Sequence, residues 1–294
     1  MEQKNSALSI ILMMVLALIW GTSFILMKKG LVAFAPGQVA AIRVTVAGLV
    51  LLPFAVMTWR QITPRHASKL FLSGMLGVFI PAFLFTAAQQ HIDSSVAGIL
   101  NTLSPLWTMV LGAAIYRQVF TRASVIGILI GLAGTVVLML SRSQGHPLSI
   151  NLYALLIVLA CAFYGLNLNF IKFNIADLRS MTITSISVVL IAPLAALYLF
   201  GFTDFTFRMQ GDPDALKSFG YVALLALMST AVAVSIFNKL VKITTPLFAS
   251  TVTYIMPVVS VMWGVLDGEV LTTSHFIGLA AILGGVYLAN RKWR

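Results

Sequence analysis

Charged residues are scarce in this chain. Asp, Glu, Lys and Arg together make up 9% of its 294 residues, and only eight residues are acidic. Soluble domains carry about a quarter charged residues, because charge covers much of the surface they present to water. A chain with so few charges cannot cover a water-exposed surface, so a soluble enzyme or soluble binding domain is excluded.

Cysteine is scarcer still. The single Cys161 lies within an apolar run, so the sequence contains no second thiol for a disulfide framework. The H-E-x-x-H motif, paired aspartates and a nucleophile elbow are also missing from the sequence, which argues against an intramembrane enzyme. We therefore expect no catalytic residues, no metal site and no cofactor.

Hydrophobic sequence is abundant. Hydrophobic residues make up 60% of the chain, and its mean hydropathy is +0.99. A membrane helix needs about 20 apolar residues, and the chain divides into ten such runs joined by short connections. The runs cover residues 7–29, 37–58, 68–90, 94–115, 123–141, 150–172, 181–201, 217–238, 246–266 and 274–290. The expected fold class is an all-α membrane protein with ten transmembrane helices.

The basic residues set the expected orientation. The formal net charge is +11, but Lys and Arg are scattered between the apolar runs rather than gathered in a stripe or tail. This scatter argues against nucleic acid as a partner. With a cytoplasmic N-terminus, 13 of the 19 Lys and Arg fall on the cytoplasmic side and five on the outside, as the positive-inside rule requires. We expect both termini in the cytoplasm and the lipid bilayer as a partner.

The two halves of the chain resemble each other in sequence. The matching pairs are Trp20 with Tyr164, Gly21 with Gly165, Ser23 with Asn167, Ala97 with Ala249, Pro105 with Pro257, Gly112 with Gly264, Gly127 with Gly278 and Gly134 with Gly285. They follow the same order across a period of five spans. Because five is odd, the second half must enter the membrane in the opposite sense. Inverted repeats of this kind build many alternating-access carriers.

Several motifs also carry a family resemblance. They are Trp20-Gly21-Thr22-Ser23-Phe24, the stretches Ser94–Pro105 and Pro246–Pro257, and Gly268-Glu269-Val270-Leu271. In this order they resemble the EamA-type branch of the drug/metabolite transporter superfamily. The resemblance implies two five-helix repeats, residues 7–141 and 150–290, around a central cavity that opens alternately to each side of the inner membrane. It also implies a small-molecule substrate, such as an amino acid or an amphipathic solute, with export as the expected direction.

The repeats differ at one terminal motif. The first carries Tyr116-Arg117-Gln118 where the second has Gly268-Glu269. If Glu269 closes a contact at one end of the bundle, the first half must close its own end differently.

Polar residues within the spans are candidates for a substrate site, because they are costly in lipid unless they face a partner or a water-filled cavity. The candidates are Asn101 and Thr108 in the fourth span, and Thr253 and Tyr254 in the ninth. Each group accompanies a proline, Pro105 or Pro257, that frees a backbone carbonyl and is expected to kink its helix. The alternative is that these residues join neighbouring helices.

The repeat selects further candidates in the first and sixth spans. Trp20 and Ser23 are equivalent to Tyr164 and Asn167, so we expect these four residues to face the cavity. Asn169 lies about 200° from Asn167 on the same helix, and we expect it to hydrogen-bond a neighbouring helix instead.

Arg43 is the only charged residue well inside an expected span. It either pairs with a substrate carboxylate in a bidentate fork or extends its guanidinium to the outer membrane interface about two turns away. The sequence leaves both alternatives open.

No Asp or Glu lies deep in any expected span. We therefore expect a uniporter or a weakly coupled carrier, with a proton-coupled drug exporter as the alternative. We expect a monomer, and a homodimer is the alternative state.

Overall fold

The computed structural model describes residues 2–117, 122–139, 152–243 and 252–290, and all of the regular structure within these ranges is helical. In the first half the helices are α1 (Glu2–Gly30), α2 (Pro36–Thr58), α3 (Pro64–Gly74), α4 (Ile80–Gln89), α5 (Ser94–Leu100), α6 (Ser104–Tyr116) and α7 (Arg122–Met139). In the second half they are α8 (Ala154–Asn174), α9 (Ser180–Gly201), α10 (Phe205–Gly211), α11 (Ala215–Leu225), α12 (Ala233–Ile243), α14 (Val252–Leu266) and α15 (Thr273–Asn290).

Short non-α segments join several of these helices end to end. A π-helical segment, η2 (Met75–Phe79), links α3 to α4, and a second, η4 (Ala226–Val232), links α11 to α12. The two 3₁₀ segments are η1 (Trp59–Gln61) and η3 (Asn101–Leu103), and η3 links α5 to α6. The two π segments lie in the third and eighth apolar runs of the sequence.

Seven helical stretches of the described residues are long and apolar enough to cross a membrane. Three shorter apolar helices, Val125–Val137, Ile255–Leu266 and Thr273–Gly285, accompany them. Helices suit a lipid environment because they satisfy every backbone hydrogen bond internally. The chain is therefore an all-helical, multi-pass membrane protein.

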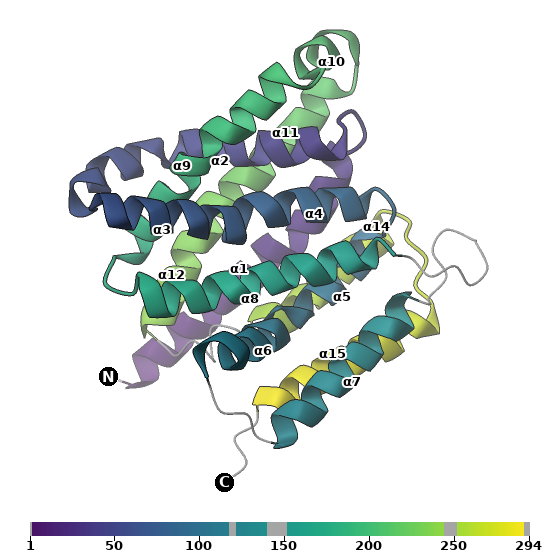
Figure 1. Cartoon of the computed structure of the whole chain (residues 1–294). Coiled ribbons are helices and arrows are strands. Elements are labelled where there is room, and N and C mark those ends of the chain that lie inside the picture. The colour runs from purple at the N-terminus through teal and green to yellow at the C-terminus, as the bar shows by residue number, and fades with distance from the viewer. Residues whose placement is uncertain (1, 118–121, 140–151, 244–251, 291–294) are drawn as a thin grey trace.

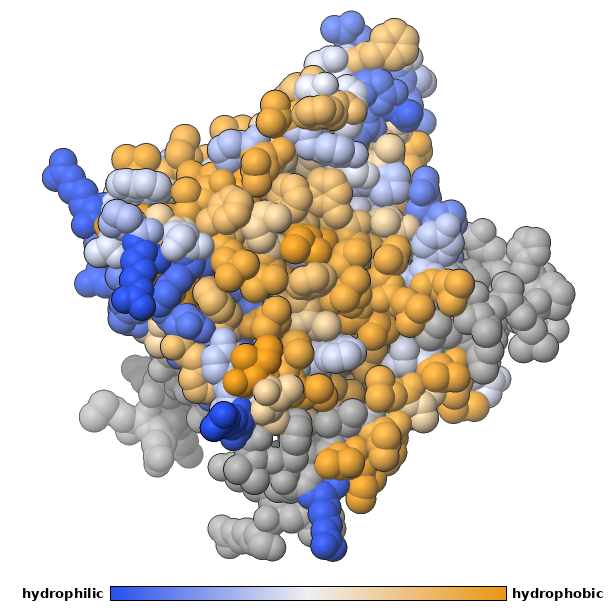
Figure 2. Space-filling model, viewed as in Figure 1, coloured by the Kyte–Doolittle hydropathy of each residue, from blue (hydrophilic) through white to orange (hydrophobic). Residues whose placement is uncertain are grey.

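The surface of the bundle is apolar where a soluble protein would be polar. Large side chains such as Leu49, Val56 and Met57 are more exposed than buried, and Figure 2 shows a broad hydrophobic face with hydrophilic residues gathered toward its edges. A patch of this extent would drive aggregation in water. In a bilayer, the same surface contacts lipid tails.

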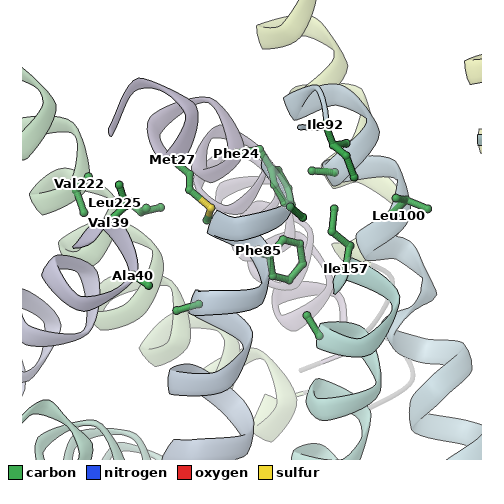
Figure 3. Close-up of a cluster of buried hydrophobic side chains, with 14 of the residues drawn as sticks. Phe24, Met27, Val39, Ala40, Phe85, Ile92, Leu100, Ile157, Val222 and Leu225 are labelled. Atoms are coloured by element: carbon green, nitrogen blue, oxygen red, sulfur yellow. The ribbon is translucent and has the colours of Figure 1, made fainter. Parts of the chain in front are cut away.

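Helices of one half pack extensively on helices of the other. The pairs in most extensive contact are α7 with α15, α2 with α9, α6 with α8, and α1 with α14. Figure 1 shows α7 and α15 side by side at one edge of the molecule. The buried core is shared in the same way: Phe24 of α1 lies beside Phe85 of α4, with Ile157 of α8 in the same cluster (Figure 3).

Glycines set the closest approaches between the halves. A methyl group on Gly285 of α15 would lie 2.5 Å from the carbonyl oxygen of Gly127 of α7, and one on Gly134 would lie 2.9 Å from that of Gly278. Small residues at these crossings let the backbones touch. The two contacts are reciprocal. Gly127 matches Gly278 in the repeat and Gly134 matches Gly285, so each contact is the repeat equivalent of the other.

Candidate functional site

Trp20 and Ser23 of α1 both contact the π segment η4. The indole Nε1 of Trp20 donates to the backbone oxygen of Ser229 at 3.1 Å, and the hydroxyls of Ser23 and Ser229 hydrogen-bond each other. The Trp20 ring also packs on Phe237, with the ring centroids 5.3 Å apart. Sequence reasoning did not identify Ser229 as a residue of this site. Its signal was the Ser229–Thr230 pair, which interrupts an otherwise apolar run.

Tyr164 and Asn167 of α8 occupy the equivalent place against the third run. Asn167 accepts a hydrogen bond at 2.8 Å from the hydroxyl of Ser73, and its amide lies directly against Gly77 of η2. The Tyr164 ring stacks on Phe85, with the ring centroids 6.0 Å apart. Each pair on α1 or α8 therefore meets a π segment. Whether the four residues face a substrate stays a prediction.

Asn169 has the role expected for it. Its Nδ2 donates to the backbone oxygen of Thr108 at 2.7 Å and to that of Gly165 at 2.9 Å. This confirms that Asn169 joins α8 to a neighbouring helix, α6. The Thr108 hydroxyl donates to the backbone oxygen of Ser104, one turn earlier in α6, at 2.8 Å.

The fourth span is broken at Pro105. Because proline has no N–H, the carbonyl of Asn101 loses its α-helical donor, and the chain forms the 3₁₀ turn η3 before α6 begins. The freed carbonyl accepts from the Ser104 hydroxyl at 2.9 Å, and the thiol of Cys161 on α8 lies 3.9 Å away. Asn101 thus lies at a polar break within the bundle, buried against α8.

Pro257 lies inside α14 instead of breaking it. Its carbonyl accepts from the Ser260 hydroxyl at 3.1 Å, and Ser260 lies against Gly98 of α5. Thr253 is half-buried on the same helix. The side chain of Tyr254 lies outside the described part of the structure.

Arg43 projects from α2 within the membrane span. Its Nε is buried without a hydrogen-bond partner, and none of the ion pairs between described residues includes it. The group that interacts with it electrostatically is the hydroxyl of Tyr164, on α8. The Nε of Arg43 therefore lies within the bundle rather than at its surface.

At one end of the bundle, the loop after α14 makes an ionic contact with α1 and α5. We call these residues the Glu269 cluster: Lys28, Ser94, Ser95, Asp267 and Glu269. The Glu269 side chain is 2% exposed and accepts from Lys28 Nζ at 2.8 Å. It also accepts from the backbone N–H of Ser94 at 2.8 Å and of Ser95 at 3.0 Å, and from both serine hydroxyls. Asp267 pairs with Lys28 at 2.9 Å and also with Lys29.

These contacts keep Glu269 ionised. Burial alone would raise the pKa of its carboxyl, but the hydrogen bonds from Lys28, Ser94 and Ser95 outweigh burial and hold the pKa at about 2. Asp93, which precedes α5, behaves differently. Burial, followed by repulsion from Glu269, raises the pKa of its carboxyl.

At the opposite end of the same span, α6 meets α8 through a hydrogen bond between neutral groups and a stacked ring. Asn174 Nδ2 donates to the Tyr116 hydroxyl at 3.1 Å, and Tyr116 stacks on Phe173 with ring centroids 4.3 Å apart. Lys172 lies over the Phe173 ring, 5.2 Å from its centroid. Arg117 ends α6 in the left-handed region, with φ 55°. We call these residues the Tyr116 contact.

The chemistry available at these places is non-covalent. Hydroxyls, amides, freed carbonyls and one guanidinium can bind a polar solute by hydrogen bonds and charge. In the parts of the chain that the structure describes, no three His, Cys, Asp or Glu side chains are grouped to hold a metal.

Comparisons with known proteins agree with this arrangement. The model of the EamA-like transporter family matches twice, over residues 7–140 and 151–291. A transporter from Archaeoglobus fulgidus is 26% identical over 93% of this chain and 95% of its own length. The inner membrane transporter YedA of Escherichia coli is 25% identical over 94% of this chain and 88% of its own.

Two further matches extend the comparison. A Salmonella typhimurium protein named as an amino-acid metabolite efflux pump is 24% identical over 98% of this chain and 95% of its own length. A solved crystal structure, 20% identical, matches the fold with a TM-score of 0.60 over 97% of this chain and 96% of its own. The family model covers nearly the whole sequence, and so this chain belongs to the EamA-like transporter family and is a membrane transporter.

Proposed function

We propose that this chain is a secondary transporter that exports a small organic solute, an amino acid or an amphipathic metabolite, across the inner membrane by alternating access. It works as a monomer of ten membrane helices, with both termini in the cytoplasm. Residues 7–141 and 150–290 form two inverted repeats around a central binding site. Transport is uniport, without a coupled proton.

The Glu269 cluster is the observation that carries the proposal. Alternating access requires a bundle that closes one end by contacts between its two halves while the other end remains free to part. Glu269, from the second half, binds Lys28 and the first turn of α5 in the first half. In the orientation proposed from the positive-inside distribution, this end is the extracellular one, which supports a state closed toward the outside.

Reciprocal contacts between the halves support the inverted repeat. A methyl group on Gly21 of α1 would lie 2.5 Å from Val259 Cβ of α14, and one on the equivalent Gly165 of α8 would lie 2.7 Å from the carbonyl carbon of Trp107 of α6. Ser23 meets η4 as Asn167 meets η2. Each of two halves related in this way can adopt the conformation of the other. The binding site is then open to the opposite side of the membrane.

The uniport proposal follows from where the acids lie. All eight Asp and Glu are at or beyond the ends of the spans, so no membrane-embedded carboxylate is available to carry a proton. The ionised Glu269 is not available either, because its pKa of about 2 keeps it deprotonated at neutral pH. The name of the Salmonella relative favours amino acids among the possible substrates.

Counterflow in proteoliposomes tests the proposal. The purified chain is reconstituted, the vesicles are loaded with one unlabelled proteinogenic amino acid at a time, and uptake of the same labelled compound is followed. A carrier accelerates uptake when the inside is preloaded, whereas a channel does not. Flux that persists after the pH gradient is collapsed supports uniport, and flux abolished by the collapse contradicts it.

The Glu269→Gln variant tests the outer closure in the same assay. Removing the charge weakens the contact with Lys28 and the α5 N-terminus, so the balance between the two access states changes and counterflow slows. Asp214→Asn is the matched control, since Asp214 is exposed and outside the cluster. Equal counterflow for Glu269→Gln and Asp214→Asn would contradict the role of the cluster.

A further inference from the structure

We propose that Arg43 and Tyr164 form a binding site for the carboxylate group of the transported solute. The inference rests on the proposed function and deepens it, because it names the chemical class of the substrate. It also decides between the two alternatives that the sequence leaves open for Arg43.

The first observation is that the Nε atom of the Arg43 guanidinium is buried without a hydrogen-bond acceptor. A buried charge is costly unless it is paired and hydrogen-bonded. Nε of Arg43 is sealed from solvent and has no acceptor among the described residues, although the side chain as a whole keeps some accessible surface. A side chain extended to the membrane interface would instead place its head group in water.

The second observation is that Tyr164 also lacks a hydrogen-bond partner among the described residues. Its hydroxyl makes no hydrogen bond to another residue in the described ranges, and its ring is held by stacking on Phe85. Arg43 and Tyr164 lie within electrostatic range of each other, from α2 and α8. Two hydrogen-bond donors from opposite halves of the chain, one charged and one neutral, therefore lie within electrostatic range of each other, and neither has an acceptor among the described residues.

The donor set selects a carboxylate. The planar guanidinium matches a carboxylate with two parallel hydrogen bonds, and a phenol hydroxyl can donate a third. One positive charge balances one negative charge, whereas a phosphate dianion would need a second cation. The Phe85 ring, which stacks on Tyr164, supplies an apolar face beside the two donors. A small carboxylate with an apolar body, from either an organic acid or an amino acid, fits these groups.

Thermal-shift titrations of the full chain in detergent test the site directly. The probes are benzoate against benzamide, and L-phenylalanine against L-phenylalaninamide, so that each acid is compared with its amide of nearly equal shape. The first pair reports an organic acid and the second an amino acid. We expect at least one acid to stabilise the wild-type chain, with an affinity about tenfold or more above that of its amide. Equal effects of acid and amide, or no stabilisation by either acid, would overturn the inference.

Variants locate the effect. Arg43→Gln is expected to weaken binding of the acid about tenfold or more and to leave the amide unaffected, with Tyr164→Phe causing a smaller loss. Arg43→Lys keeps the positive charge but cannot make the two parallel hydrogen bonds of a guanidinium. Its affinity for the acid should therefore fall between those of the wild type and Arg43→Gln. Arg60→Gln, at an exposed position, controls for loss of charge. If Arg43→Gln does not elute as a folded species, the acid–amide comparison on the wild type and on Tyr164→Phe still decides.

The inference and the proposed function fail separately. Counterflow of a solute that lacks a carboxylate, together with no acid binding, would leave the transporter standing and remove the Arg43 site. Acid binding that depends on Arg43, together with no counterflow of any bound compound, would keep the site and remove the transport proposal.

Discussion

The two ends of the span from Ser94 to Tyr116 are held in different ways. At its first end, Glu269 and Lys28 bring an ion pair and two backbone N–H groups together. At its last end, Tyr116 meets Asn174 and Phe173 through one neutral hydrogen bond and a stacked ring. The first contact is an ion pair whose carboxylate is nearly buried. The second consists of neutral groups, which can separate without leaving an unpaired charge.

This difference shows where the two halves depart from each other. In the middle of the bundle their contacts are reciprocal, as at Gly21 and Gly165. At the ends the contacts are not reciprocal, because the second half carries Gly268-Glu269 where the first carries Tyr116-Arg117-Gln118. Under the alternating access that we propose, a strong contact at one end and a weak one at the other would give the two access states unequal free energies, and this bias can be measured.

The largest expected effect is at Glu269. Replacement by Ala leaves Lys28 and the N–H groups of Ser94 and Ser95 without their acceptor, and we expect the free energy of unfolding to fall by about 2–3 kcal/mol. Thermal or denaturant unfolding in detergent measures it. Asp214→Ala, at an exposed site, should stay within about 0.5 kcal/mol of the wild type. A loss at Glu269 no greater than that at Asp214 would mean that the cluster does not hold the bundle.

The next effect compares the reciprocal glycines. A methyl group at Gly165 would lie 2.6 Å from the Thr108 backbone nitrogen, and one at Gly21 would lie 2.5 Å from the Cβ of Val259. The position of a Cβ atom is fixed by its backbone, so neither neighbour can turn away, and Gly165→Ala and Gly21→Ala should each cost about 1–3 kcal/mol of unfolding free energy. Gly220→Ala is the control, because no atom lies within 4 Å of the added methyl. A loss at only one of the two glycines would show that the two crossings are not packed alike.

Tyr116→Phe tests the weaker end. The change removes the acceptor for Asn174 and keeps the ring that stacks on Phe173. We expect a loss of about 1 kcal/mol, measured by the same unfolding assay. A loss equal to that of Glu269→Ala would remove the contrast between the two ends.

The smallest expected effect is that of pH. Because the folded pKa of Glu269 is about 2 and its usual value is 4.5, its stabilisation is complete above the usual value and disappears as the pH falls toward 2. The difference in melting temperature between the wild type and Glu269→Gln should therefore stay constant from about pH 5 to 8 and shrink below about pH 4.5. A difference that changes near neutral pH would point to another titrating group, such as the neighbouring Asp93.

Sequence reasoning predicted the parts of this structure that depend on the solvent. Apolar runs of membrane length become helices because lipid offers the backbone no hydrogen bonds, and Asn169 was correctly assigned to packing from its angle on α8. It raised an end contact at Glu269 only as a condition, and it did not identify the partners Lys28, Ser94 and Ser95.

Partners across the bundle could not be predicted from one helix at a time. Ser229 was missed because it meets Trp20 and Ser23 from a segment some 200 residues away, and helical periodicity carries no such pairing. The π segments also change the angle between residues on either side of them, so a face inferred at 100° per residue is not continuous through η2 or η4. The assignment of Trp20, Ser23, Tyr164 and Asn167 to a substrate face stays a prediction for the same reason.

The buried Cys161 has a practical consequence. It is the only cysteine in the sequence, and its thiol is fully enclosed beside the carbonyls of Leu100 and Asn101. A new cysteine placed at either end of the bundle would therefore be the one thiol open to a water-soluble maleimide, with no background to remove. The native chain is already suited to measuring, from each side of a membrane, which end is open.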